Sequence, residues 1–272
     1  MFGNITLGQY FPGNSPVHRL DPRTKIILAA VYITLIFIVD SLLGYLAALL
    51  FIVVGAALSG IRVRYLLKGL KPIFYIIIFT FLVNLLFASN GKPLWRWWIF
   101  TITDFGIQNA IFMSLRLVFL MLGTQVMLLT TSPLALTDGI ETLLNPLKKI
   151  RLPVHELAMM MTIALRFIPT LLEETDKIMK AQASRGADFE SGNILKRARN
   201  MVPLLVPLFV SAFRRADELA LAMEARCYKG GTGRTRMKVL KFTPTDIWAA
   251  LVMLALAAAI VADKIFTTGP IL

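Results

Sequence analysis

The sequence predicts an all-α, polytopic membrane protein with about five transmembrane helices and a group of cytoplasmic amphipathic helices between the fourth and the fifth. Three observations lead to this fold class. Hydrophobic residues make up 57% of the 272 residues, whereas soluble domains have about 45–50%. These residues are concentrated in long runs, as expected for helices in lipid. The net charge of +13 comes from basic residues that flank those runs, which indicates a membrane protein and not a nucleic-acid-binding one.

The first apolar run, 26–58, is interrupted only by Asp40-Ser41. As one helix it would reach roughly 50 Å at about 1.5 Å per residue, much more than the hydrocarbon core of about 30 Å. We therefore predict two spans, 24–39 and 42–59, with a tight turn at Asp40. Three further runs have close to the ~17–25 residues that a spanning helix needs, and they predict spans at 72–88, 107–129 and 247–262.

The distribution of lysine and arginine predicts the orientation. If the N-terminus is cytoplasmic, segments 1–25, 60–71 and 130–246 lie inside and hold 3, 4 and 18 basic residues, which is 25 of the 29 in the chain. Cytoplasmic segments of membrane proteins carry this excess of positive charge. Five spans then place the C-terminus outside, and we expect a multi-pass protein of the bacterial cell membrane.

Few polar groups occur within the predicted spans. Arg116 is the main ionisable one, and Asn84 and Gln125 are uncharged. Carriers driven by protons or ions usually have carboxylates or histidines in their helices, and none is evident here. Arg116 either lines a pathway or, the reading we favour, snorkels to the outer interface or bonds a backbone carbonyl. An outer aromatic belt is expected from Trp95, Trp97 and Trp98.

The predicted organisation has three segments: 1–129 with the first four spans, 130–244 as a cytoplasmic helical region, and 245–272 with the last span and an external C-terminus. Prolines end or kink helices. Those of the middle segment are expected to break it into three helical units, at about 134–150, 154–185 and 194–228. The prolines concerned are Pro133, Pro146, Pro153, Pro169, Pro203 and Pro207.

The second and third units are expected to be amphipathic helices with apolar stripes at helical spacing. The stripe of the second unit comprises Ile168, Leu171, Leu172, Thr175, Ile178, Met179 and Gln182. That of the third comprises Phe209, Ala212, Phe213, Ala216, Leu219, Ala220 and Met223, with Arg214, Arg215, Asp217 and Glu218 on the opposite face.

Both units end in an arginine between two small residues, Ser184-Arg185-Gly186 and Ala225-Arg226-Cys227. Small neighbours leave the helix end narrow, so it can enter a groove and present the guanidinium to a carboxylate or carbonyl. An ordinary arginine at a helix C-terminus is the simpler reading of either motif alone. Two such motifs on similar helices favour a pair of docking tips.

These two motifs resemble the paired Ala-Arg-Gly signatures of the transmembrane component of energy-coupling factor (ECF) transporters. The opening Gly8-Gln9-Tyr10 and His18-Arg19-Leu20-Asp21-Pro22-Arg23-Thr24-Lys25 are also similar to that family. The resemblance extends over nearly the whole chain. Two departures are Ser184 in place of alanine and Cys227 in place of glycine, while both arginines are retained.

The resemblance implies that the 130–244 region forms coupling helices. In that family, each arginine-bearing tip inserts into one of two ATP-binding subunits. The same helices hold a substrate-binding (S-type) membrane subunit that captures a vitamin or a metal ion. The unequal tips suggest two different ATPases, and the opening segment suggests a module shared by several S-type subunits. Met159-Met160-Met161 would suit such a shared surface because methionine is adaptable, although core packing explains it equally well.

The sequence contains no complete enzyme motif among those considered. The glycine-rich stretch 230–235 lacks the Lys-Ser/Thr pair of a phosphate-binding loop, so ATP hydrolysis is left to partner subunits, and that stretch is expected to be a linker. His155-Glu156 is followed by Met159 where a zinc helix needs its second histidine. We expect no cofactor, no metal and no nucleic acid. A stand-alone secondary transporter or channel is the alternative function, and a membrane-embedded hydrolase is a distant third.

Overall fold

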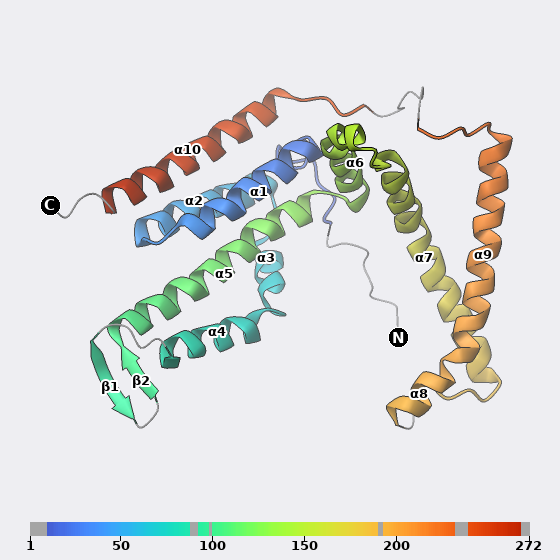
Figure 1. Cartoon of the computed structure of the whole chain (residues 1–272), viewed down its shortest axis with the longest axis horizontal. Coiled ribbons are helices and arrows are strands. Elements are labelled where there is room, and N and C mark those ends of the chain that lie inside the picture. Colours follow the sequence, from blue (N-terminus) through green and yellow to red (C-terminus); the bar gives the residue numbers. More distant parts are fainter. Residues whose placement is uncertain (1–9, 88–91, 98–99, 190–192, 232–238, 268–272) are drawn as a thin grey trace. The chain divides into compact units, whose positions relative to one another are not determined.

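The computed structural model describes residues 10–87, 92–97, 100–189, 193–231 and 239–267 (Figure 1). Contacts between residues divide the chain into two units. Of the described residues, those between 141 and 231 form unit 1, and those between 10 and 140 and between 239 and 267 form unit 2. The three predicted segments 1–129, 130–244 and 245–272 remain a prediction about domain organisation.

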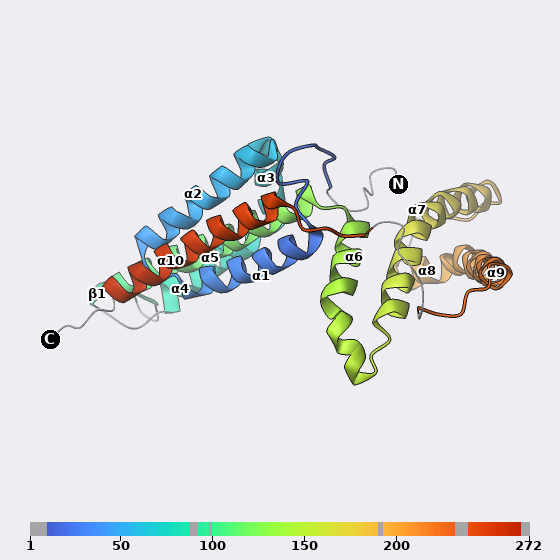
Figure 2. The ribbon, with the colours of Figure 1, turned by 90° about the horizontal axis from the view of Figure 1, so that it is seen from above.

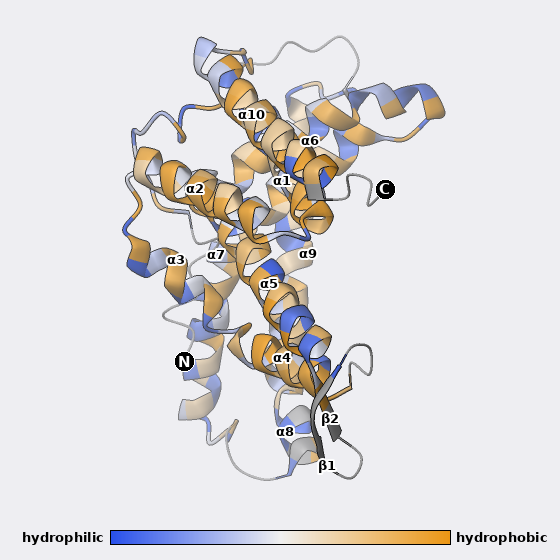
Figure 3. Cartoon of the chain, turned by 90° about the vertical axis from the view of Figure 1, so that its left-hand side faces the viewer, coloured by the Kyte–Doolittle hydropathy of each residue, from blue (hydrophilic) through white to orange (hydrophobic). Residues whose placement is uncertain are grey.

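Unit 2 consists almost entirely of apolar helices, which are coloured orange over most of their surface in Figure 3. In chain order, its elements are α1 (Pro22–Ile38), α2 (Leu42–Ser59), α3 (Val63–Leu70), α4 (Phe74–Phe87), β1 (Pro93–Trp97), β2 (Phe100–Thr103), α5 (Asp104–Thr130), most of α6 (Pro133–Leu144) and α10 (Pro244–Thr267). Helices α1, α2, α5 and α10 run along a common direction in both Figure 1 and Figure 2.

Side-chain caps set where these helices begin. Asp21 accepts a hydrogen bond from the Arg23 amide at the start of α1. Ser41 Oγ accepts one from the Gly44 amide at the start of α2, and Thr103 Oγ1 accepts one from the Gly106 amide at α5. Such caps satisfy amides that have no partner within the helix. The prediction of two separate helices with a break at Asp40 is confirmed.

Helix α5 is the centre of unit 2, because α1, α2, α3 and α4 all contact it, and α10 packs on α1 and α2. The core beside it includes Tyr32, Ile36, Tyr45 and Phe119. The backbone of Gly123 lies so near Tyr32 that a Cβ at position 123 would be 2.1 Å from the tyrosine ring. The Tyr32 hydroxyl donates to the Phe119 carbonyl at 2.9 Å.

Two segments expected to be loops contain regular structure. The basic segment 60–71 forms α3, which meets α4 at an angle of 59°. Its buried Gly69 lies against Gln125 of α5, and a Cβ there would be 2.6 Å from the amide carbon. Strands β1 and β2 form an antiparallel pair in which Trp97 is opposite Phe100. The predicted tryptophan belt depends on side chains outside the described residues.

Among the described residues, α2, α5, α7 and α10 are long and apolar enough to cross a membrane, and the bent pair α3–α4 counts as a fifth if it forms one span. Helix α1 has 17 residues, the lower end of the usual length. The all-α polytopic fold class is therefore confirmed. Helix α7 has the lowest mean hydropathy of the four, 1.2 against 1.8 to 2.4.

Unit 1 contains the end of α6 and four further elements: η1 (Asn145–Ile150), α7 (Val154–Ser184), α8 (Ile194–Asn200) and α9 (Val202–Ala225). These match the three predicted helical units. Pro169 and Pro207 lie inside α7 and α9, in agreement with the bounds of the second and third predicted units. A proline removes one backbone hydrogen bond, and helices of 31 and 24 residues retain enough others to continue.

Candidate functional site

Helices α7 and α9 cross as an antiparallel pair within unit 1 (Figure 1). Glu174 of α7 accepts hydrogen bonds from Ser211 Oγ at 2.5 Å and from Arg215 Nη2 at 2.8 Å. Since the helices run in opposite directions, their C-terminal ends, Arg185 and Arg226, point away from the crossing on opposite sides. At about 1.5 Å per residue, the two ends lie up to roughly 35 Å apart.

The face of α7 that packs on its neighbour is the predicted one. All seven stripe residues, from Ile168 to Gln182, are partly buried, whereas Glu173, Lys177 and Lys180 are exposed. Packing of an apolar stripe against another helix is what holds most amphipathic helices in place.

The prediction for α9 is wrong in part. Phe209 and Phe213 belong to the predicted packing stripe, yet they are 61% and 68% exposed. Arg215 was assigned to the outer face, yet it turns toward α7 and pairs with Glu174. The contact face follows Ser211, Ala212, Arg215, Leu219 and Met223, all partly buried. Both faces of α9 are apolar, so hydrophobic spacing alone did not identify the one that packs.

The end of α7 has a well-defined backbone geometry. Helical hydrogen bonding stops at Ser184, and Gly186 adopts a left-handed conformation with φ of +86°. The Gly186 amide donates to the Ala183 carbonyl, and the Ala187 amide donates to the Gln182 carbonyl, both at 3.0 Å. This pair of bonds defines a Schellman motif.

The end of α9 repeats that geometry 41 residues later in the sequence. The Cys227 amide donates to the Glu224 carbonyl at 2.8 Å, and the Tyr228 amide donates to the Met223 carbonyl at 3.0 Å. Cys227 has a φ of +54°, in the left-handed region that glycine occupies most easily. The conformation therefore explains why a glycine is preferred at this position and why cysteine is an unfavourable replacement.

Both motifs place an arginine directly before the left-handed residue. Arg185 and Arg226 are exposed, as are Ser184, Gly186, Ala225 and Cys227. Neither guanidinium has a hydrogen bond or an ion pair within the part of the chain that the structure describes. Ser184 Oγ donates to the Lys180 carbonyl at 3.0 Å, so this serine is bonded to its own helix. The structure thus provides two similar, narrow helix ends with free cations.

The backbone conformation of the two helix ends predicts opposite effects for two substitutions. Replacing Cys227 by glycine should relieve a left-handed strain of about 1 kcal/mol, and replacing Gly186 by alanine should introduce it. Hydrogen exchange measures this locally. We expect the Tyr228 amide to exchange about fivefold more slowly in Cys227→Gly, and the Ala187 amide about fivefold faster in Gly186→Ala. No atom lies within 4 Å of a Cβ at Gly186, so a steric clash would not account for the second result. Unchanged exchange in both variants would contradict this account.

The polar groups of the predicted spans join helices to one another. Arg116 Nη2 donates to the Val39 carbonyl at 2.9 Å and to Asp40 Oδ1 at 3.0 Å. The first of these is the bond to a backbone carbonyl that we favoured for Arg116 from the sequence. Asn109 Nδ2 donates to Asn84 Oδ1 at 2.9 Å. These contacts tie α5 to the α1–α2 turn and to α4.

Unit 1 shows no metal-binding arrangement in its described residues: no group of three or more His, Cys, Asp or Glu side chains is close enough to hold an ion. His155 Nδ1 instead lies 3.0 Å from Glu141 Oε1. This pair joins the start of α7 to α6. The incomplete zinc pattern at His155 therefore belongs to a contact between helices.

Known proteins are similar to this chain over most of its length. Residues 13–239 match the family described as CbiQ, cobalt transport protein. The chain is 59% identical over 256 residues to the energy-coupling factor transporter transmembrane protein EcfT of Acidaminococcus fermentans, covering 94% of this chain and 95% of that protein. The EcfT proteins of Clostridium kluyveri and Bacillus subtilis are 54% and 50% identical, with 98% and 95% of this chain covered, and 99% and 97% of those proteins.

The chain belongs to the EcfT family of energy-coupling factor transporter transmembrane proteins. The resemblance found in the two arginine motifs and the opening segment is therefore confirmed. Membership also establishes the chain as a multi-pass membrane component of a transporter that has other subunits. In this EcfT-family chain, the two capped helix ends of unit 1 are the candidate functional site.

Proposed function

We propose that this chain is the coupling scaffold of an ATP-driven importer, in which Arg185 and Arg226 each dock into one of two ATP-binding subunits. The observation that carries the proposal is the repeated helix end: twice, the same cap contains an exposed arginine that has no partner among the described residues. A free guanidinium on a narrow tip suits a carboxylate or carbonyl in a groove. Tips on opposite sides of the α7–α9 crossing suit two separate subunits. The third residue of each motif differs, Gly186 in one and Cys227 in the other, which suggests that the two subunits are not identical.

The exposed apolar surface of unit 1 suggests where the substrate-binding membrane subunit docks. Val206, Phe209 and Phe213 of α9 are 56%, 61% and 68% exposed, and they lie on one face of the helix. Met160 and Met161 of α7 are about half exposed. A contiguous apolar face of this kind marks an interaction surface, and methionine adapts to more than one partner. These features support a module shared by several substrate-binding subunits for vitamins or related micronutrients.

The orientation follows from the same proposal. With the N-terminus in the cytoplasm, unit 1 and its basic residues face the compartment that contains ATP, and the C-terminus lies outside. The arginine-rich surface of α7 to α9 is then on the side with the excess of positive charge. Helix α7 lies at or near the membrane surface, where its exposed Glu173, Lys177 and Lys180 remain in water.

Reconstitution in liposomes tests this function against a stand-alone carrier. The chain is inserted alone, or with the two ATP-binding subunits and a riboflavin-binding membrane subunit, and uptake of labelled riboflavin is measured with and without ATP. We expect uptake only from the complete set with ATP. Uptake by the chain alone without nucleotide would overturn the proposal in favour of a carrier. A complete set that fails to assemble, or that assembles without taking up riboflavin, would also contradict it.

A further inference from the structure

In the described part, the chain leaves unit 2 within α6, between Ile140 and Glu141, and it belongs to unit 2 again from Val239. In the described part, the covalent connections between α7–α9 and unit 2 are therefore the segment that follows α5 and the segment that precedes α10. The end of α5 and the residues at the start of α10 each have polar contacts with residues 21–25 at the start of α1.

The outgoing segment is attached to α1 through Lys25. The Lys25 Nζ group donates to the carbonyl of Thr130, the last residue of α5, at 2.9 Å, and the residue is only 6% exposed. A cation at the C-terminal end of a helix is stabilised by the helix dipole. Beyond it, α6 lies against the same turn, because a Cβ on Gly139 would be 3.0 Å from Ile26 and 3.1 Å from Pro22.

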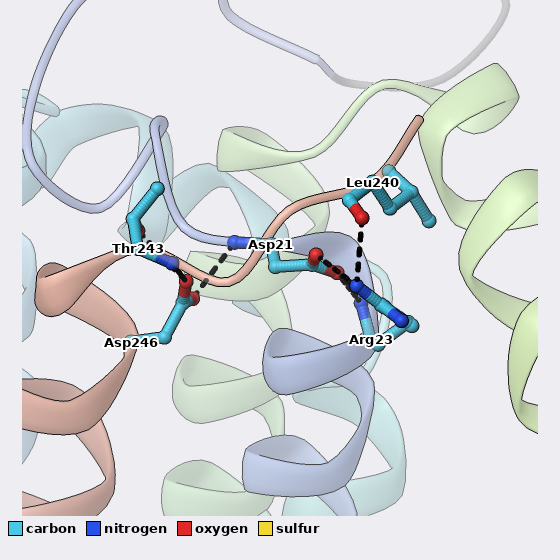
Figure 4. A network of polar contacts seen from close by, with 5 residues as sticks. All are labelled: Asp21, Arg23, Leu240, Thr243 and Asp246. Carbon is cyan, nitrogen blue, oxygen red and sulfur yellow. Dashed lines mark hydrogen bonds and ion pairs between the residues drawn. The ribbon is translucent and has the colours of Figure 1, made fainter. Parts of the chain in front are cut away.

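The returning segment is attached to α1 through Arg23 and Asp21 (Figure 4). Arg23 Nη2 donates to the Leu240 carbonyl at 3.2 Å, and its guanidinium lies 4.2 Å from the centre of the Phe242 ring. The Asp21 amide donates to Asp246 Oδ1 at 2.8 Å. Asp246 Oδ2 in turn accepts from the amide and the hydroxyl of Thr243, both at 2.7 Å.

These charges form a balanced and buried cluster. Asp21 and Asp246 are each 4% exposed, and Asp21 accepts from Arg23 Nε at 3.0 Å and Nη2 at 2.8 Å. Two carboxylates thus accompany two cations, Arg23 and Lys25. Buried polar networks of this kind specify one arrangement of the elements that they join, so within unit 2 the start of α1 holds the end of α5 and the start of α10 in a defined arrangement.

We propose that Asp21–Lys25 is the joint through which movement of the α7–α9 unit is passed to the membrane helices, and that Arg23 and Asp246 are its positioning residues. The proposal rests on the function proposed above and adds a separate claim to it. The ATP-binding subunits dock at Arg185 and Arg226. The joint determines whether the movement that ATP hydrolysis drives in those subunits also moves α1 and α10. Loss of the joint should leave the complex assembled and uncouple ATP hydrolysis from transport.

The test uses the complete complex in liposomes with the double variant Arg23→Gln/Asp246→Asn, which removes one charge of each sign and leaves the cluster neutral. We expect wild-type yield of the assembled complex and ATP hydrolysis within about twofold of wild type. Riboflavin transported per ATP should fall about tenfold, a typical coupling between sites. Lys241→Gln is the matched control, because Lys241 is an exposed cation of the returning segment, and we expect it to behave as wild type.

If riboflavin transported per ATP stays unchanged in the double variant, whether or not both rates fall, the proposed role of Asp21–Lys25 is contradicted. The single variant Asp246→Asn keeps the shape of the side chain, so it remains a test if the double variant does not fold, with a smaller loss in the same direction. Failure of the wild-type complex to assemble would instead refute the proposed function.

Hydrogen exchange provides a readout that needs no transported substrate. In the wild-type complex with the ATP-binding subunits, ATP should alter amide exchange at the ends of α7 and α9 and also at the first turn of α1. In the double variant, the change at α7 and α9 should remain and that at α1 should disappear. An ATP-dependent change at α1 that persists in the double variant would overturn the proposal.

Discussion

Charge reversal at both helix ends, Arg185→Glu with Arg226→Glu, is expected to abolish co-purification of the chain with the two ATP-binding subunits. Each arginine is an exposed cation on a rigid, capped helix end. Reversal would replace a charge-assisted contact by repulsion, and the loss of one such buried contact costs about 2–5 kcal/mol. Each single reversal should weaken assembly, because the other site still retains the complex, and both together should eliminate it.

Arg214→Glu is the matched control for the helix ends. Arg214 is an exposed arginine of the same helix α9, three turns before Arg226, and it lies outside the capped end. Yield in detergent, insertion into membranes and co-purification are compared for all variants. Full recovery of both ATP-binding subunits with the double variant would show that docking does not use these tips, and equal loss in Arg214→Glu would show that only the overall charge matters.

Gly123→Ala is expected to have the largest effect on the stability of unit 2. The new Cβ would lie 2.1 Å from the Tyr32 ring, and Tyr32 is 2% exposed within the core. The ring cannot withdraw without breaking the bond from its hydroxyl to the Phe119 carbonyl at 2.9 Å. Overpacking of this kind costs about 1–3 kcal/mol, so we expect a clear fall in the thermal unfolding temperature in detergent.

Gly55→Ala serves as the control for that substitution. Gly55 also lies inside an apolar helix, α2, but no atom is within 4 Å of a Cβ built there. We expect an unchanged or slightly higher unfolding temperature, because alanine favours helix over glycine by about 1 kcal/mol. The close packing of α1 on α5 would be contradicted if the two variants unfolded at the same temperature.

Much of the secondary structure could be predicted from local features of the sequence. The interruption at Asp40-Ser41 separated α1 from α2 correctly, because Ser41 begins a helix by capping it. The arginine–small-residue ends of α7 and α9 were located correctly as helix ends for the same kind of reason: a left-handed residue must follow the last turn. Helix α3 was missed because its 8 residues are too few for a span, and because Arg64 and Lys68 gave the segment the basic character of a cytoplasmic loop.

The candidate site was predictable only in part. The two arginines and their four neighbours could be named because a cap is a local structure, encoded within about six consecutive residues. The pairing of Arg215 with Glu174 could not be named, since α9 has two apolar faces and only its neighbour decides which of them is covered.

The sequence by itself determined that this chain is a multi-pass helical membrane protein with two similar arginine-bearing helix ends, because lipid requires long apolar runs and helix ends require particular residues. Only the tertiary structure brought Asp21, Arg23 and Lys25 together with Thr130, Leu240 and Asp246. These partners are more than 100 positions apart. Their charges are stable in a buried site only when the whole bundle places them in contact, and no local pattern records that contact.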